Sequence, residues 1–264
     1  MIYPSVLQGD TARRSSQNVA DHTVMAQKGA AMQTVYFHGL PGGAADLDIA
    51  DWASARRPRV MSPPDESLDI TGDNSVHIIA FSGGAHPALT LAARNPDTVT
   101  KVSLIAPVAP LEIKDWSNAS LSGDLLYLAK SDPDAAHGAF TGLIEAAKVD
   151  PAALLDDLFA GASAGEVALK DDPKLRQHFV TMITDGLVSN GAAIRDAFIA
   201  MAQPWAGILP QVTVPVEIHV GTADRRCPPD MSDAIADRVS GPVTVHRLPE
   251  LGHYGALRSF AATV

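Results

Sequence analysis

Ala80-Phe81-Ser82-Gly83-Gly84 follows directly on the apolar run Val76-His77-Ile78-Ile79. The run predicts a buried strand, the serine stands on a tight turn, and the small residues after it predict the start of a helix. Such a turn strains the backbone of its serine and lifts the hydroxyl clear of the sheet. Small residues are needed two positions on either side, where strand and helix backbones nearly touch, and Ala80 and Gly84 meet that need. A serine held in this way becomes a nucleophile when a base removes its proton.

Strand and helix signals alternate along the chain on both sides of this turn. Turn-rich or helical segments separate the apolar, β-branched runs, a pattern that favours an α/β fold with a mostly parallel sheet flanked by helices. The runs lack strict alternation of apolar and polar residues, as expected of strands covered on both faces. Strands are predicted at residues 34–37, 59–62, 76–81, 102–105, 212–220 and 242–248.

Residues 110–209 differ from the rest of the chain in the spacing of their apolar residues. Apolar residues recur there at helical spacing, as in Leu154-Leu155-Leu158 and Ile194-Phe198-Met201, and no comparable strand signal interrupts them. We expect a helical cap over the C-terminal edge of the sheet, where ligand sites of α/β proteins form. The predicted division is a core of residues 1–110 and 206–264 with a cap at 111–205.

A serine nucleophile needs a histidine base, and the base needs an acid that fixes its tautomer. Asp224 lies in the loop after the strand that ends at Val220, and His253 lies in the loop after the last strand. Asp230 and Asp115 are alternative acids, because the first is close to Asp224 and the second follows the preceding strand.

Four motifs occur in one order: the His38-Gly39 loop, the turn at Ser82, the Asp224 loop and Gly252-His253. Together they resemble the α/β-hydrolase superfamily of lipases, esterases and epoxide hydrolases, over nearly the whole chain. The resemblance implies an α/β-hydrolase fold with a helical cap inserted before the acid-bearing strand.

The resemblance also implies roles for single residues: Ser82 as nucleophile, His253 as base and Asp224 as orienting acid. The backbone N–H groups of Gly83 and Leu40 would form an oxyanion hole. His38 and Gly39 would support that loop. No metal and no organic cofactor is implied.

One segment departs from the pattern of the superfamily. Met61-Ser62-Pro63-Pro64 leads almost at once into Ile70-Thr71-Gly72-Asp73 and the next strand, which removes most of a supporting helix. The shortening affects the expected shape of the pocket more than the three catalytic candidates.

Other conspicuous residues have ordinary structural interpretations. We expect His86 to pack on its helix or face solvent, with a second base as the less favoured alternative. Trp116 and Trp205 are expected to line the pocket or pack at the hinge of the cap, and Cys227 to be a buried apolar residue. Asp46, Asp48 and Asp51 are expected on a solvated helix face and not at a metal site.

Composition limits the classes of partner. The net charge is −10 and adjacent basic residues are few, so nucleic acid and anionic membranes are disfavoured. A single cysteine allows no internal disulfide, and residues 1–21 show no signal-peptide pattern, which favours a cytoplasmic location. A homo-oligomer stays open.

The sequence therefore predicts a serine hydrolase that cleaves a small, partly apolar ester or related acyl compound through an acyl-enzyme. Amidase, lactonase, C–C hydrolase, acyltransferase and perhydrolase chemistry stay open on the same three residues. An aspartate nucleophile is disfavoured, because position 82 is serine. The alternative from another class is a ligand-binding or signalling protein that keeps the fold without turnover.

Overall fold

The computed structural model describes residues 32–62 and 75–264 of the 264-residue chain. Its strands are β1 (Gln33–Phe37), β2 (Arg59–Met61), β3 (Val76–Phe81), β4 (Val99–Ile105), β5 (Val216–Gly221) and β6 (Val243–Leu248). They form one sheet in the order β2-β1-β3-β4-β5-β6, and every neighbouring pair is parallel. The expected parallel sheet is confirmed.

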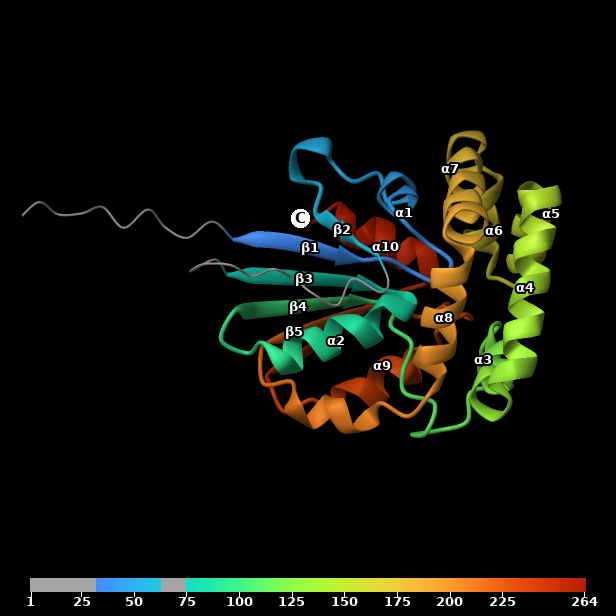
Figure 1. Ribbon diagram of the computed structural model, residues 1–264. Coiled ribbons are helices and arrows are strands. Elements are labelled where there is room, and N and C mark those ends of the chain that lie inside the picture. The colour runs from blue at the N-terminus through green and yellow to red at the C-terminus, as the bar shows by residue number, and fades with distance from the viewer. Residues whose placement is uncertain (1–31, 63–74) are drawn as a thin grey trace, which may run out of the picture.

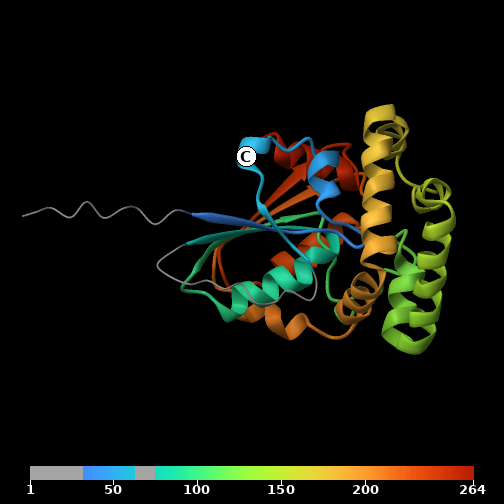
Figure 2. The same cartoon turned by 45° about the horizontal axis from the view of Figure 1, so that its top comes forward.

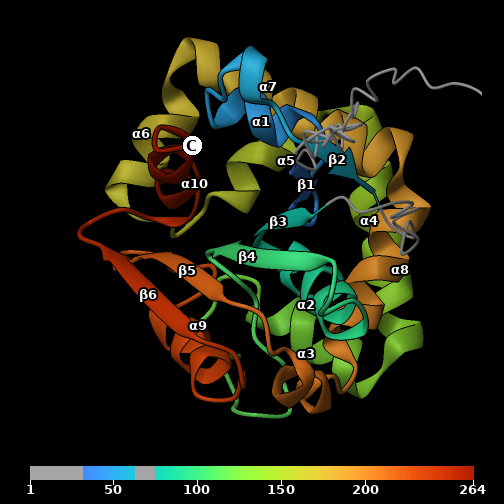
Figure 3. The ribbon, with the colours of Figure 1, turned by 90° about the vertical axis from the view of Figure 1, so that its left-hand side faces the viewer.

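Two pairs of helices cover the two faces of the sheet (Figures 1 and 3). On one face lie α2 (Ala85–Arg94) and α9 (Pro229–Ala236), and on the other lie α1 (Ala45–Ile49) and α10 (His253–Ala261). All six residues of the central strand β3 are buried, because helices pack on both of its faces. The chain thus builds three layers with the core on either side of the sheet.

The segment between β4 and β5, here called the helical insertion (residues 111–205), contains six α-helices. They are α3 (Gly123–Ser131), α4 (Pro133–Val149), α5 (Pro151–Leu158), α6 (Ala164–Asp171), α7 (Pro173–Ile183) and α8 (Gly191–Ala202), with a π-helical segment at Thr184–Ser189. Figures 1 and 2 show these helices standing at the end of the sheet to which the strands point.

Asp-Pro pairs begin three helices of the insertion. Asp132, Asp150 and Asp172 each accept hydrogen bonds from backbone N–H groups of the first turn, and a proline follows each at the first helical position. An N-cap carboxylate satisfies free N–H groups, and proline suits the position where its missing N–H costs nothing. The sequence therefore sets the starts of α4, α5 and α7 locally.

Most predicted strand boundaries agree with the structure within a few residues, but the start of β5 is wrong. The prediction begins that strand at Val212, whereas β5 begins at Val216. Pro215 has no N–H to donate to a ladder, although its carbonyl still accepts from Val102 N at 2.9 Å.

Two sequence expectations fall on parts of the chain outside the description. The shortened segment lies between the end of β2 at Met61 and the start of β3 at Val76, and its residues 63–74 lie outside the described residues. Residues 1–21, where the sequence shows no signal-peptide pattern, also lie outside the described residues. Within the described ranges, none of the helices combines the length and hydrophobicity needed to cross a bilayer.

Candidate active site

Ser82 stands on a strained turn between β3 and α2. Its φ is +54°, in the left-handed region that a residue with a Cβ seldom adopts. A short 3-10 turn, Ser82–Gly84, leads into α2, and the serine is buried. The strain predicted from the sequence is confirmed.

Gly84 has a different neighbour from the one that the sequence suggests. A Cβ at Gly84 would lie 2.5 Å from the carbonyl oxygen of Phe37 and 2.8 Å from that of His38. The close approach is therefore to the end of the neighbouring strand β1, not to β3 itself. Glycine at this position lets the turn seat against the loop that follows β1.

His253 and Asp224 meet at the C-terminal edge of the sheet. His253 Nδ1 lies 2.7 Å from Asp224 Oδ2, and both side chains are almost fully buried. The other oxygen, Oδ1, accepts from the backbone N–H of Arg226 at 2.8 Å and of Cys227 at 2.9 Å. The carboxylate is thus fixed by the backbone of its own loop and oriented towards the imidazole.

The two alternative acids have other partners. Asp115 is exposed and accepts from the N–H and hydroxyl of Ser117. Asp230, at the start of α9, forms an ion pair with Lys114. Of the three candidate acids, Asp224 is the one that contacts His253.

Opposing influences set the protonation of His253. Burial, the largest of them, lowers the pKa of the imidazole, whereas the Asp224 carboxylate and, to a smaller extent, the Cys227 side chain raise it, and the pKa lies above its ordinary value. The imidazolium that forms when a base takes a proton is stabilised at this site.

Ser82 and His253 line one small cavity of about 20 Å³, together with Gly39, Leu40, Phe81 and Tyr254. The Phe81 ring lies 4.7 Å from the imidazole, centroid to centroid. Among the described residues, no hydrogen bond joins the Ser82 hydroxyl to the imidazole of His253. Catalytic contacts of this kind are often long without substrate and tighten in the complex.

Leu40 and Gly83 lie against each other beside Ser82. A Cβ on Gly83 would meet the Leu40 side chain at 3.0 Å, and one on Gly39 would lie 3.5 Å from the Cβ of Ser82. The two backbone segments predicted to supply oxyanion donors are therefore adjacent.

Asp46 braces this loop, and the expectation of a solvated helix face is wrong for it. Asp46 is fully buried, and its Oδ2 accepts from Gly39 N at 3.0 Å and from the Tyr36 hydroxyl at 3.1 Å. Burial raises the pKa of its carboxyl. The signal in the sequence is that Asp46 shares a helical face with Ile49 and Ala50, both buried.

His38 contributes to the same loop. Its Nδ1 lies 2.7 Å from the carbonyl oxygen of Gly39, to which the ring N–H donates, and the side chain is buried. Gly42 must be glycine here, because a Cβ would lie 2.3 Å from that same carbonyl oxygen. The loop after β1 is thus held from both sides, by His38 and by Asp46.

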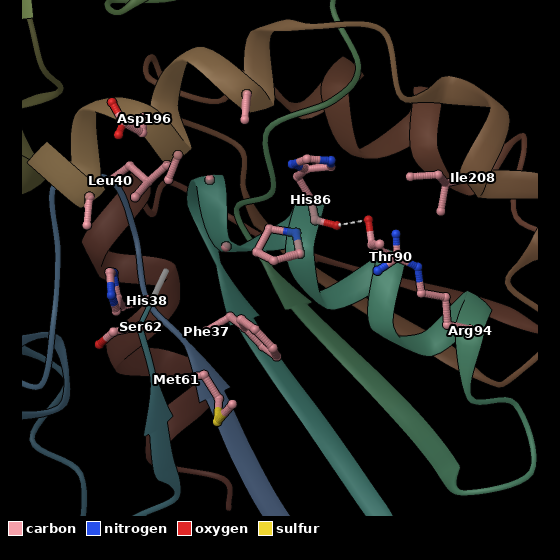
Figure 4. Close-up of a pocket in the computed structure, with 16 residues that line it drawn as sticks. Phe37, His38, Leu40, Met61, Ser62, His86, Thr90, Arg94, Asp196 and Ile208 are labelled. Atoms are coloured by element: carbon pink, nitrogen blue, oxygen red, sulfur yellow. Dashed lines mark hydrogen bonds between the residues drawn. The ribbon is translucent and has the colours of Figure 1, made fainter. Parts of the chain in front are cut away.

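A larger cavity of about 610 Å³ opens beside this loop. Its walls come from the ends of β1 and β2, from one side of α2 and from α8, and Figure 4 shows His86 and Thr90 of α2 in it with Leu40 of the loop. Leu40 lines both cavities, so the large cavity neighbours the small one. Most of its lining is apolar, which suits a hydrocarbon group.

Three side chains on the sheet could offer ligand atoms to a metal. Among the described residues, Glu217, His219 and His246 bring such atoms within 4.8 Å of one another. The two rings stack with 17° between their planes, so their nitrogen lone pairs run side by side and do not converge. Lys101 Nζ also lies 2.8 Å from Glu217 Oε2. As folded, the set does not match the convergent geometry of a metal centre.

The remaining conspicuous residues pack as expected. The His86 ring lies 5.1 Å from Trp205, whose Nε1 donates to the Met201 carbonyl. Trp116 is buried in the core, and Cys227 is a buried free thiol.

Comparison with known proteins bears on the fold. No sequence profile of a known protein family matches the chain, and no curated protein sequence matches it. Among solved structures, the chain is similar to an esterase from Thermogutta terrifontis (15% identity, 89% of this chain and 87% of that chain, TM-score 0.61). It is also similar to an esterase from Exiguobacterium antarcticum (18%, 89% and 90%, TM-score 0.58).

An enol-lactonase from Burkholderia xenovorans is a third such structure (14% identity, 90% of this chain and 91% of that chain, TM-score 0.57). Each comparison spans about nine tenths of both chains. The parallel sheet, the strained serine turn and these similarities agree, and the chain has the α/β-hydrolase fold.

Proposed function

We propose that the chain is a serine hydrolase that cleaves a small ester or related acyl compound through an acyl-enzyme. The observation that carries the proposal is the buried His253–Asp224 pair, whose histidine lines the same cavity as Ser82 on its positive-φ turn. The esterases and the lactonase among similar structures support hydrolysis as the class of reaction.

In this mechanism His253 Nε2 accepts the Ser82 proton while Oγ attacks the acyl carbonyl carbon. The N–H groups of Leu40 and Gly83 stabilise the oxyanion that forms. The imidazolium then gives its proton to the leaving oxygen, and the C–O bond breaks to leave Ser82 acylated. His253 then takes a proton from a water molecule, whose oxygen attacks the acyl carbon; as the bond from that carbon to Ser82 Oγ breaks, the imidazolium returns the proton to Oγ and the carboxylic acid is released.

The cavity beside the oxyanion loop is the basis for proposing an apolar group in the substrate. It begins at Leu40, close to the reacting carbonyl, and is mostly apolar. One group of the substrate, acyl or alcohol, would therefore be a hydrocarbon of modest size. The helical insertion, residues 111–205, would act as the cap that closes the site from water.

A series of nitrophenyl esters with acyl chains from acetate to decanoate tests this proposal. We expect many turnovers per molecule, with kcat/KM highest at an intermediate chain length that the cavity admits. Ser82→Ala should abolish turnover, whereas Ser131→Ala, an exposed serine of α3, should leave it unchanged. Steady turnover by Ser82→Ala would contradict the proposal.

A second candidate is a protein that binds an acyl ligand without turning it over. The narrow space at Ser82 and the lack of a Ser82–His253 hydrogen bond favour it. It predicts release of one equivalent of nitrophenol followed by no steady state, which the same assay distinguishes.

A further inference from the structure

Glu166 is a buried carboxylate far from Ser82 in sequence and bound to the helix that carries His253. It lies on α6 of the helical insertion, and 4% of it is exposed. Its Oε2 accepts from the backbone N–H of Tyr254 at 3.0 Å, and its Oε1 accepts from that of Gly255 at 2.9 Å.

These two N–H groups are the ones that an N-cap side chain normally satisfies. Helix α10 begins at His253, so Tyr254 and Gly255 are its second and third residues, and the N-cap Gly252 has no side chain to offer. The carboxylate of Glu166, on helix α6, caps α10 in its place. Its negative charge also lies at the positive end of the helix dipole.

Gly252 makes room for this contact. A Cβ at position 252 would lie 2.3 Å from the Cγ of Glu166 and 2.7 Å from its Oε1. The backbone there has φ −94° and ψ −157°, which any residue adopts, so the glycine is needed for space and not for conformation. Glycine before His253 and glutamate at 166 therefore fit as a pair.

Other contacts join the insertion to both loops of the His253–Asp224 pair. The Tyr254 ring packs on Phe159 and Phe179 with centroid distances of 5.6 and 4.8 Å. Next to Asp224, Arg225 donates to the Gly161 carbonyl at 2.6 Å and Arg226 donates to that of Leu158 at 2.5 Å. The insertion holds the acid loop and the base helix together.

We propose that Glu166 is a positioning residue for His253, and that docking of the helical insertion sets the imidazole in line with Ser82. The inference rests on the proposed hydrolase function. Glu166 lines neither the small cavity nor the large one, so it acts through α10 and not on substrate.

The first test compares Glu166→Ala and Glu166→Gln with Glu145→Ala, an exposed glutamate of α4, in the full chain. Glu166→Ala should lower kcat about 10- to 100-fold, because a small misplacement of the base is costly. KM should change less than about twofold, since ground-state binding does not involve Glu166. Glu166→Gln keeps one acceptor and should lie between Ala and the parent, and Glu145→Ala should match the parent.

The second test is a double-mutant cycle with Gly252→Ala. That substitution should lower kcat by displacing Glu166, although it changes no charge. If both residues act through one contact, Gly252→Ala in the Glu166→Ala background should cause no further loss. If the fold-losses in kcat of the two single variants multiply in the double variant, the two residues act independently and the proposed contact between them is not the cause.

Hydrogen exchange separates this inference from the proposed function. In Glu166→Ala, exchange should accelerate in peptides covering the first turn of α10 and not in α2, whether or not the protein hydrolyses esters. Turnover by the parent together with parental kcat in folded Glu166→Gln and Glu166→Ala would overturn the inference alone. If Glu166→Ala does not fold, parental kcat in Glu166→Gln suffices to overturn it. No turnover by the parent, with faster exchange in the variant, would overturn the function alone.

Discussion

At the scale of single residues, the proposed mechanism makes activity depend on the charge state of His253. Its imidazole must be neutral to accept the Ser82 proton, and Asp224 raises its pKa above the ordinary value against the opposing effect of burial. Activity should therefore fall as the pH drops through the raised pKa of the free enzyme, and kcat/KM should show that pKa as its acid limb.

Asp224→Asn should change both the height and the position of that limb. Loss of the carboxylate removes the largest influence that raises the pKa of His253, while burial, which lowers it, and the smaller raising influence of Cys227 remain. The midpoint of the acid limb should move to lower pH, while kcat falls on the order of 10⁴-fold because the tautomer is no longer fixed. A pH profile of kcat/KM measures both, with Asp157→Asn on exposed α5 as control. A midpoint that stays in place or rises contradicts the assignment of Asp224.

Sequence reasoning reaches residues whose role follows from local pattern and misses those defined by distant contacts. Ser82, Asp224 and His253 each follow a predicted strand, so their convergence at one edge of a parallel sheet could be expected. Glu166 could not be found in this way, because its partners are backbone N–H groups 88 and 89 residues away.

At the scale of elements, two glycines should respond to alanine in opposite directions. Gly84→Ala would push a Cβ to 2.5 Å from the Phe37 carbonyl, so the turn and β1 must separate. We expect a loss of roughly 1–3 kcal/mol in free energy of unfolding. Gly138 lies inside α4 with open space around it, and Gly138→Ala should stabilise by about 0.5–1 kcal/mol. Urea unfolding followed by circular dichroism measures both; a stable Gly84→Ala would contradict the packing described for the turn.

Elements with complete local signals are predicted well, and elements that depend on distant contacts are predicted less well. The apolar run of β3 gives its boundaries at both ends, and the helical periodicity of residues 110–209 gives the insertion. Helix α1 shows the opposite case. Its Asp46 is a charged residue, which a sequence pattern assigns to the surface. Only the folded structure shows that the carboxylate is buried and accepts hydrogen bonds from the Tyr36 hydroxyl and the Gly39 N–H.

At the scale of the whole molecule, a buried histidine, His77, and a partly buried one, His219, should make the fold sensitive to acid. Burial is the largest cause that lowers the pKa of His77 and of His219, each to about 4. The unfolded chain binds these protons near pH 6.5, whereas the folded chain does not until about pH 4. The contribution of these two histidines to the free energy of unfolding should be fully present above about pH 6.5 and be lost as the pH drops towards 4.

The double variant His77→Gln/His219→Gln should flatten that dependence. The free energy of unfolding, measured in urea from pH 7 to pH 4, should fall less steeply than in the parent. Because the pKa of His253 is raised in the folded chain, this group makes stability rise as the pH falls from 7 through about 6.5, and it adds no slope below about pH 5.5, where it is protonated in both states. His137→Gln, on the exposed side of α4, is the matched control. An unchanged slope in the double variant would show that the two histidines bind protons in the folded chain.

The fold class follows from the sequence because alternating strands and helices allow few arrangements. The shape of the pocket does not, since it depends on how α8 lies over α2 and on the loop after β1. In the proposed mechanism, the Oγ of Ser82 is the atom that becomes acylated.

Labelling with a fluorophosphonate, followed by mass spectrometry of the peptides, tests that dependence most directly. The account predicts one adduct per molecule, on Ser82, lost in Ser82→Ala and kept in Cys227→Ala. An adduct on another residue, or none in a protein that hydrolyses esters, would contradict it.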